Sequence, residues 1–261
     1  MLGLALSGGA ARGAWQAGRA HSLARQWEIV AGVSVGSVNA AHLAQYELGD
    51  EARAMEDLRV LWHSLRTRDV HRRWFPFGAL HSLWRTGVRD VRPLRKFLCR
   101  HLSPARIIAS GRGLRIAAVC YATRQWRVWT EEDAAGVVDQ VMASCAIPYA
   151  FEPQAVAGVR YVDGGVRTVV PFATLVQAGC TEVDAIVCFP DPPPIAEPPG
   201  NALEAGLASV DTQSYQLILD DLQTPQVPCE LHVYRPDRDL GDGLDFSPET
   251  NAWRWQLGAD E

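Results

Sequence analysis

Short apolar runs alternate with longer helical patterns along the first fifty residues of the chain. Apolar runs occupy residues 2–6 and 28–33, and each is followed by a glycine-containing turn. Patterns typical of helices then extend over residues 13–26 and 34–48. Strand, helix, strand and helix with short connections predict a βαβ unit, and therefore a parallel sheet.

The same reasoning predicts further elements downstream. The expected strands are 114–121, 126–130, 156–162, 183–189 and 230–234, and the expected helices are 134–145, 171–178, 202–222 and 248–257. The proline-rich residues 190–200 are expected to form a surface loop. Without internal repeats or a clear boundary, residues 1–261 are expected to form one α/β domain, a three-layer α/β/α architecture around a mostly parallel sheet.

One basic and aromatic segment, residues 59–100, interrupts this alternation. It carries eleven cationic side chains and only two acidic ones, interleaved with tryptophan and phenylalanine. We expect residues 58–105 to form a cap-like insertion over the strand ends. Two interpretations stay open: amphipathic helices with inward aromatics and solvated arginines, or an interfacial surface that meets an anionic membrane.

Composition indicates which binding partners and which cellular compartment to expect. The formal net charge of −5 disfavours a nucleic-acid partner, which usually requires a basic footprint. The six cysteines show no Cys-x-x-Cys pattern, which favours reduced thiols in a cytoplasmic protein over disulfides or a zinc site. No apolar run is long enough for a transmembrane helix, and residues 2–6 are a strand rather than a signal peptide. We therefore expect a cytoplasmic protein, peripheral to a membrane under the second interpretation, of undefined oligomeric state.

The turn after the second apolar run has the sequence Gly32-Val33-Ser34-Val35-Gly36. A Gly-x-Ser-x-Gly turn between a strand and a helix is typical of an exposed nucleophilic serine. Gly32 and Gly36 lack the Cβ atoms that would crowd such a turn. Ser34 is therefore the candidate nucleophile, and the start of the following helix favours a developing negative charge beside it.

A second turn, SGGAARG at residues 7–13, joins the first strand to the first helix. Glycines at such a position let backbone amides converge on an anion. Because adjacent parallel strands deliver their following turns to one edge of the sheet, this loop should lie beside Ser34. The loop lacks the endings of nucleotide-binding motifs, so we favour an oxyanion site over a phosphate site.

A general base is expected at Asp163, which ends a strand and precedes Gly164 and Gly165, two glycines that permit a sharp turn. A plain Asp-Gly turn is the alternative. His42, which falls in the helix after Ser34, and His232, which has the chain order of an α/β-hydrolase triad, are alternative bases. His232 lies within a predicted strand, and we favour a structural role for it.

Together these segments resemble the patatin-like phospholipases. The loop SGGAARG at 7–13, the elbow GVSVGSVNA at 32–40, the stretch ASCAIPYAFEP at 143–153 and YVDGG at 161–165 follow the order of that family, and the resemblance spans roughly residues 2–190. It implies the patatin-like variant of the serine hydrolase architecture. The sequence departs from the family at Ala10, where a third glycine is usual, and after the DGG motif, where the family often has asparagine before a proline.

The resemblance also implies a mechanism without histidine, and we expect no cofactor and no metal, since no cluster of residues in the sequence has the spacing of metal ligands. Ser34 would attack the ester carbonyl of a lipid and Asp163 would accept its proton. Amides around Gly8, Gly9 and Ala10 would hold the oxyanion, and Arg12 matches the basic residue with which the family orients the loop or meets lipid phosphate. The supporting loop and elbow residues are Arg12, Gly13, Gly32, Gly36, Gly164 and Gly165. We expect a phospholipase A-type acyl hydrolase of lipids or small esters; a Ser-His-Asp esterase using His232 and a non-catalytic lipid- or anion-binding protein are the alternatives.

Overall fold

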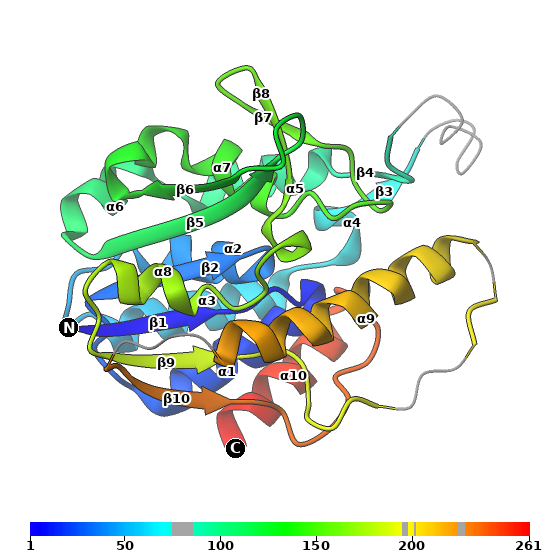
Figure 1. Ribbon diagram of the computed structural model, residues 1–261. Helices are drawn as coiled ribbons and strands as arrows, with labels where there is room; N and C mark the ends of the chain where they lie inside the picture. The colour runs from blue at the N-terminus through cyan, green and yellow to red at the C-terminus, as the bar shows by residue number, and fades with distance from the viewer. Residues whose placement is uncertain (75–85, 195–197, 201, 224–227) are drawn as a thin grey trace.

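The computed structural model describes residues 1–74, 86–194, 198–200, 202–223 and 228–261, with a mixed, mostly parallel sheet at its centre (Figure 1). The main sheet has the strand order β10-β9-β1-β2-β5-β8-β7, and β6 pairs with β5. β10, β9, β1, β2 and β5 run parallel, whereas β6, β7 and β8 are antiparallel additions. The strands are β1 Leu2–Leu6, β2 Ile29–Val33, β5 Gly113–Cys120, β6 Trp126–Thr130, β7 Gln154–Val156, β8 Val159–Asp163, β9 Glu182–Ile186 and β10 Glu230–Tyr234.

Helices cover both faces of this sheet, which confirms the expected α/β/α fold (Figure 1). Alternation along β1 separates two cores: Leu4 and Leu6 pack on one face, and Ala5 packs on the other. The helices are α1 Gly13–Leu23, α2 Val35–Leu43, α3 Glu51–Ser64, α4 Thr67–Val70, α5 Arg92–His101, α6 Pro104–Ser110, α7 Val137–Ser144, α8 Phe172–Gln177, α9 Ala202–Gln223 and α10 Pro248–Asp260.

Most predicted elements are present with shifted ends, and one is different. Residues 156–162, expected as a single strand, belong to a hairpin in which Val156 of β7 pairs with Val159 of β8. Ala157 and Gly158 form its turn, with φ values of 49° and 80°. A turn with two consecutive positive φ values reverses the chain within two residues, and Gly158 accommodates one of them without a Cβ. The hairpin matters because β8 ends at Asp163.

The described part of the basic segment packs its aromatic side chains inward. Trp62, Trp74 and Phe97 are each less than 10% exposed, whereas Arg66, Arg68, Arg73 and Arg100 are exposed. The first interpretation is therefore confirmed for these aromatic residues. Phe75, Phe77 and Trp84 lie outside the described residues, and membrane contact stays a prediction.

The segment begins within α3, continues through α4 and a small hairpin of β3 Arg72–Arg73 and β4 Arg89–Asp90, and ends in α5. Among the described residues, none of the helices is long and apolar enough to cross a membrane.

Candidate active site

The candidate nucleophile occupies a strained turn between β2 and α2. Ser34 has φ 53° and ψ −127°, a conformation that non-glycine residues rarely adopt and that marks functional sites. Its amide donates a 2.9 Å hydrogen bond to Oγ of Ser144, which in turn donates to the carbonyl of Ala117 at 2.7 Å. Ser144 thus connects the elbow to the neighbouring strand β5 and stabilises its geometry.

Two glycines make the tight elbow sterically feasible. A Cβ on Gly32 would lie 2.1 Å from the carbonyl oxygen of Gly36, and a Cβ on Gly36 would lie 2.2 Å from that of Leu6. Both distances are far below contact distance, so a side chain on Gly32 would push β2 away from the start of α2, and one on Gly36 would push the elbow away from β1. The Gly-x-Ser-x-Gly spacing is therefore a packing requirement at this turn.

Asp163 ends β8, which reaches the edge of β5 on the side opposite β2. It is 4% exposed, and its Oδ1 accepts a 2.7 Å hydrogen bond from the amide of Gly165. Its Oδ2 is buried without a hydrogen-bond partner among the described residues. Gly164 lets the chain approach closely, because a Cβ there would lie 2.7 Å from the carbonyl oxygen of Ala117.

Burial raises the pKa of Asp163 to about 7. The neighbouring Ser34 side chain and the hydrogen bond from Gly165 act in the opposite direction and only partly offset the cost of removing the carboxylate from water. A carboxylate with a pKa near neutrality, facing a serine hydroxyl, has the properties of a general base.

The glycine-rich loop supplies two amides with no acceptor in the described chain, those of Gly9 and Ala10. The amide of Gly8, also expected to hold an oxyanion, instead donates to the carbonyl of Val169 at 3.1 Å. The expectation for Gly8 is thus corrected: its amide anchors the glycine-rich loop to the backbone of Val169. A Cβ on Gly9 would lie 2.4 Å from Cβ of Cys188, which explains a glycine there.

Ala10, which replaces the third glycine usual in the family, adopts φ 51°. It therefore adopts a left-handed conformation that a glycine would adopt without strain. Its methyl group points toward Gly243, 3.5 Å from the position of a Cβ on that glycine.

Arg12 and Gly13 fix the end of the same loop. The Arg12 guanidinium donates to the carbonyl of Gly241 at 3.3 Å, lies 3.6 Å from Asp211 and stacks 5.0 Å from the ring centre of Phe189. These contacts support the first of its two expected roles, orienting the loop, which stays a prediction. A Cβ on Gly13 would lie 2.3 Å from a methyl of Val35, so Gly13 lets the starts of α1 and α2 touch.

Two cavities meet at Ser34. The larger one is lined by Asp163, Gly165 and the loop residues Gly8, Gly9, Ala10 and Arg12. The other has an almost wholly apolar lining that includes Trp62, Leu94 and Phe97 from the basic segment. The structure thus brings Ser34, Asp163 and the glycine-rich loop together, and the basic segment contributes an apolar wall.

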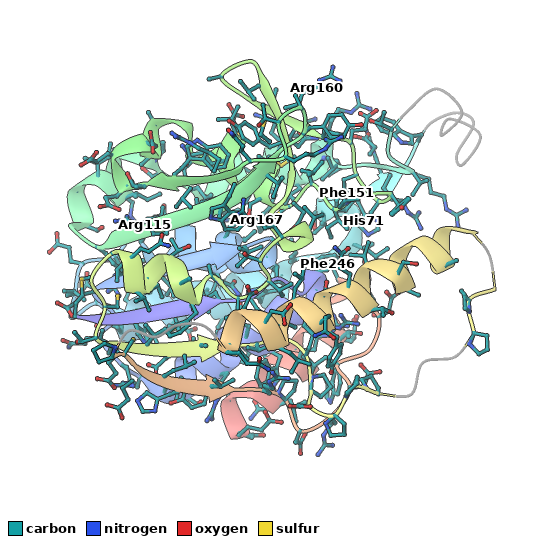
Figure 2. The ribbon with its side chains drawn as sticks, viewed as in Figure 1. His71, Arg115, Phe151, Arg160, Arg167 and Phe246 are labelled. Carbon is teal, nitrogen blue, oxygen red and sulfur yellow. The ribbon has the colours of Figure 1, made fainter. Side chains whose placement is uncertain are left out.

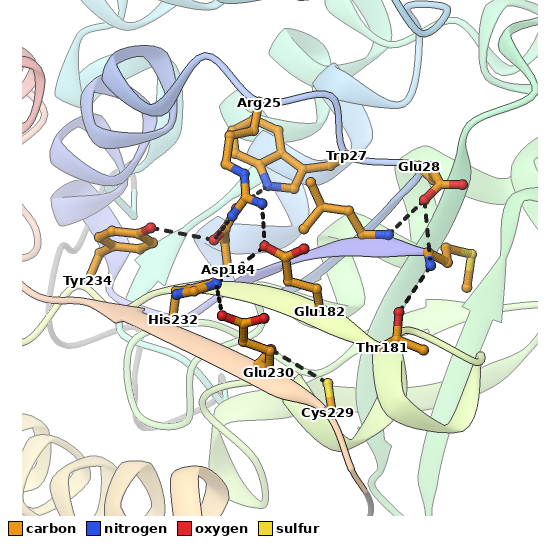
Figure 3. Close-up of polar contacts among 12 residues, drawn as sticks. Arg25, Trp27, Glu28, Thr181, Glu182, Asp184, Cys229, Glu230, His232 and Tyr234 are labelled. Atoms are coloured by element: carbon orange, nitrogen blue, oxygen red, sulfur yellow. Dashed lines mark hydrogen bonds and ion pairs between the residues drawn. The ribbon is translucent and has the colours of Figure 1, made fainter.

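The structure places the alternative base His232 away from this site. In the parallel register His232 pairs with Asp184, and β9 and β1 separate its strand from β2, a distance of about 14 Å for three strand spacings. Its Nε2 lies 3.3 Å from Glu182, which also pairs with Arg25 (Figure 3). His42 is likewise engaged elsewhere: it is buried, and its Nε2 donates to the carbonyl of Ala54 at 3.1 Å.

Among the described residues, Glu182, Glu230 and His232 form the one cluster spaced like metal ligands. Because Arg25 lies against Glu182, its positive charge already balances part of the carboxylate charge in this cluster (Figure 3). The cluster is also remote from Ser34.

Sequence reasoning missed several residues that build the site. Ser144 lies in the ASCAIPYAFEP stretch, which gave a position but no role. Asp221 of α9 accepts hydrogen bonds from the amides of Val169 and Val170 at 2.7 and 2.9 Å. Leu244 contributes to both cavities from a loop near the C-terminus. Nothing in the local sequence around the last two residues signals a link to residues far away along the chain.

The sequence model of the family described as patatin-like phospholipase matches residues 4–176. The chain therefore belongs to the patatin-like phospholipases, a family of lipid acyl hydrolases.

Among solved structures, the chain is similar to VipD from Legionella pneumophila, with a TM-score of 0.45 and 12% identity. That alignment covers 99% of this chain and 65% of VipD. No curated protein matches the chain significantly.

Proposed function

We propose that this protein is a serine acyl hydrolase that cleaves fatty-acyl esters of lipids with a Ser34–Asp163 dyad. The observation that carries the proposal is the meeting of a strained, buried Ser34 with a buried carboxylate whose pKa is raised to about 7 in one cavity. Other polar residues of this protein are also buried, so burial alone does not distinguish Ser34 and Asp163. The two side chains share a cavity with two amides that have no acceptor, and this arrangement supports acyl transfer.

The proposed reaction has two steps, acylation of Ser34 and hydrolysis of the acyl-enzyme. Asp163 takes the hydroxyl proton as Oγ of Ser34 bonds to the acyl carbon, and the amides of Gly9 and Ala10 receive the resulting oxyanion. Collapse expels the alcohol, which takes the proton from Asp163. Water then attacks the acyl-enzyme, gives a proton to Asp163, and releases the acid as the proton returns to Ser34.

The apolar cavity favours a substrate with a hydrocarbon chain. Its lining includes Val38, Leu61, Leu65 and Phe151, and none of the lining residues in the described part of the chain is charged. We therefore assign the acyl chain to this cavity and the alcohol to the larger one, which contains Arg12 and Asp211. Phospholipase A-type cleavage is consistent with this assignment, and a small ester would occupy the same two spaces.

The test combines active-site labelling with turnover. An alkyl fluorophosphonate should label the parent protein at Ser34, and Ser34→Ala should abolish labelling and lower ester hydrolysis by on the order of 10⁴-fold or more. Asp163→Asn should lower hydrolysis by about 10²- to 10⁴-fold. His232→Ala should retain full turnover, whereas loss of activity there would favour the triad alternative. A folded parent that neither labels nor hydrolyses esters would instead be a binding protein.

A further inference from the structure

A loop near the C-terminus, residues 240–247, forms a wall of the candidate active site. It connects β10 to α10 and lies outside the residues matched by the family model. The carbonyl of Gly243 accepts a 2.8 Å hydrogen bond from the amide of Ala11, so the loop is fixed directly to the oxyanion loop. Its next residue, Leu244, lines both the apolar cavity and the larger cavity that holds Asp163.

One buried arginine holds this loop in place. Arg254 of α10 has no exposed surface, and its guanidinium donates to the carbonyls of Leu240, Asp242 and Asp245 at 2.9, 2.7 and 2.7 Å. A buried charge is costly unless its donors are satisfied, and here three backbone carbonyls on one short loop satisfy them. Because one rigid planar guanidinium donates all three hydrogen bonds, the three carbonyls are held in a fixed arrangement, and this fixes the curvature of the loop.

The other side of the loop is fixed to the basic segment. His71 donates from Nε2 to the carbonyl of Leu244 at 3.2 Å, and the amide of Phe246 donates to Thr67 at 3.1 Å. The rings of Phe151, His71 and Phe246 gather beside this point, with centroids 6.1 and 6.2 Å from that of His71 (Figure 2). Leu244 is therefore held from α10, from the oxyanion loop and from the basic segment at once.

We propose that Leu244 is a specificity-determining residue that separates the acyl chamber from the alcohol chamber, and that Arg254 is the positioning residue that holds it there. The inference rests on the proposed function, because it assigns the two cavities to the two parts of one ester. Leu244 lines both cavities beside Ser34, so its side chain limits how much bulk an ester carries next to the reacting carbonyl.

The experiment compares linear and branched acyl esters of one alcohol, such as 4-nitrophenyl butyrate and 4-nitrophenyl 2-ethylbutyrate. Leu244→Ala removes three carbon atoms from the wall, so the kcat/KM ratio of branched to linear ester should rise about tenfold or more. Leu244→Trp should lower the same ratio. Leu219→Ala, at an exposed leucine of α9, is the matched control and should leave the ratio unchanged.

Arg254→Met tests the positioning role, because it removes the donors and keeps most of the side-chain length. It should shift the ratio in the same direction as Leu244→Ala, and Arg254→Lys should restore it only partly, since an ammonium cannot bond all three carbonyls in the same geometry. Trp253→Ala, exposed on the same helix, is the control. If Arg254→Met does not fold by circular dichroism, Arg254→Lys tests the positioning role in its place, and an unchanged kcat/KM ratio in a folded Arg254→Lys would overturn that role.

The outcomes separate this inference from the proposed function. If Leu244→Ala changes kcat/KM by the same factor for both esters, Leu244 has a purely structural role and the inference is overturned. If the Leu244 variants change the kcat/KM ratio of branched to linear ester and a folded Arg254→Met does not, only the positioning role of Arg254 is overturned. A parent protein that takes no fluorophosphonate label would contradict the proposed function instead.

Discussion

The amide of Gly8 donates a 3.1 Å hydrogen bond to the carbonyl of Val169. The amide of Val169 in turn donates to Asp221 at 2.7 Å. The oxyanion loop is thus linked through one backbone segment to a carboxylate on α9. The family often has an asparagine before a proline in this region, and here an aspartate from a distant helix holds the backbone.

Replacing Asp221 should therefore impair catalysis without contacting the substrate. Asp221→Ala leaves two amides without their acceptor, and we expect kcat to fall about tenfold with little change in KM, because the loop positions the oxyanion rather than the ground-state ester. Asp221→Asn, which keeps an acceptor oxygen, should restore most of kcat. Asp220→Asn, at the exposed neighbour, is the control, and steady-state kinetics at pH 8 are the measurement. A rise in KM at constant kcat would contradict the positioning role.

The pH dependence of hydrolysis should follow the ionisation of Asp163. The base must be ionised, and burial raises its pKa to about 7. We therefore expect kcat/KM to be constant above about pH 8 and to fall tenfold for each pH unit well below 7. Initial rates with a neutral ester from pH 5 to 9 test this expectation. A profile that stays flat down to pH 5 would mean that the proton acceptor is a carboxylate with an ordinary pKa.

The same raised pKa affects the free energy of unfolding. Between the ordinary pKa near 4 and about 7, the folded protein retains a proton on Asp163 that the unfolded chain has lost, so stability contributed by this group decreases as pH rises through that window. Asp163→Asn removes the titration. We expect the variant to gain stability relative to the parent at pH 8, by roughly 2–4 kcal/mol, and to gain much less at pH 5. Urea unfolding of both proteins at the two pH values measures the difference, and an equal difference at both values would contradict it.

The parts of the site that sequence predicted are those set by local geometry. Gly32, Gly36 and Gly164 are required because a Cβ would collide with backbone within the same turn or the adjacent strand. The parallel order of β1 and β2 then brings the loop and the elbow to one edge of the sheet. These constraints act over a few residues or one βαβ unit, so they are visible as motifs.

The parts that sequence did not predict depend on contacts between distant segments. Asp221 is one acidic residue among several on α9, and only the fold brings it to Val169. In the sequence, Arg254 is one cation within a predicted helix and has no visible role. Only the fold shows that its guanidinium donates hydrogen bonds to three carbonyls of one loop. The role of Gly8 was wrong for the same reason, since its acceptor, the Val169 carbonyl, lies on a segment far along the chain.

Ala10 offers a direct test of the departure from the family pattern. Because Ala10 already has φ 51°, Ala10→Gly should leave the loop in place and change kcat by less than about threefold. Ala10→Val should cost about 1–2 kcal/mol of stability, since a β-branched residue resists positive φ, and should reduce hydrolysis at least tenfold. Ala157→Val, at φ 49° in the exposed β7–β8 turn, should cost similar stability with unchanged activity. Equal losses of activity in both valine variants would assign the effect to general destabilisation.

The exposed arginines of the basic segment should bind anionic membranes. Arg66, Arg68 and Arg73 lie on the solvent side of a segment whose aromatics face the interior, so charge rather than insertion would drive binding. At about 1 kcal/mol per arginine, their combined replacement by glutamine should weaken partition onto phosphatidylserine-containing vesicles by on the order of 100-fold. Arg124, Arg160 and Arg238, exposed outside this segment, form the matched triple control.

Cosedimentation at 50 and 500 mM salt measures the effect, and the parent protein should lose most of its binding at the higher salt because exposed charges are screened. Equal binding to neutral and anionic vesicles would leave the segment with its packing role alone.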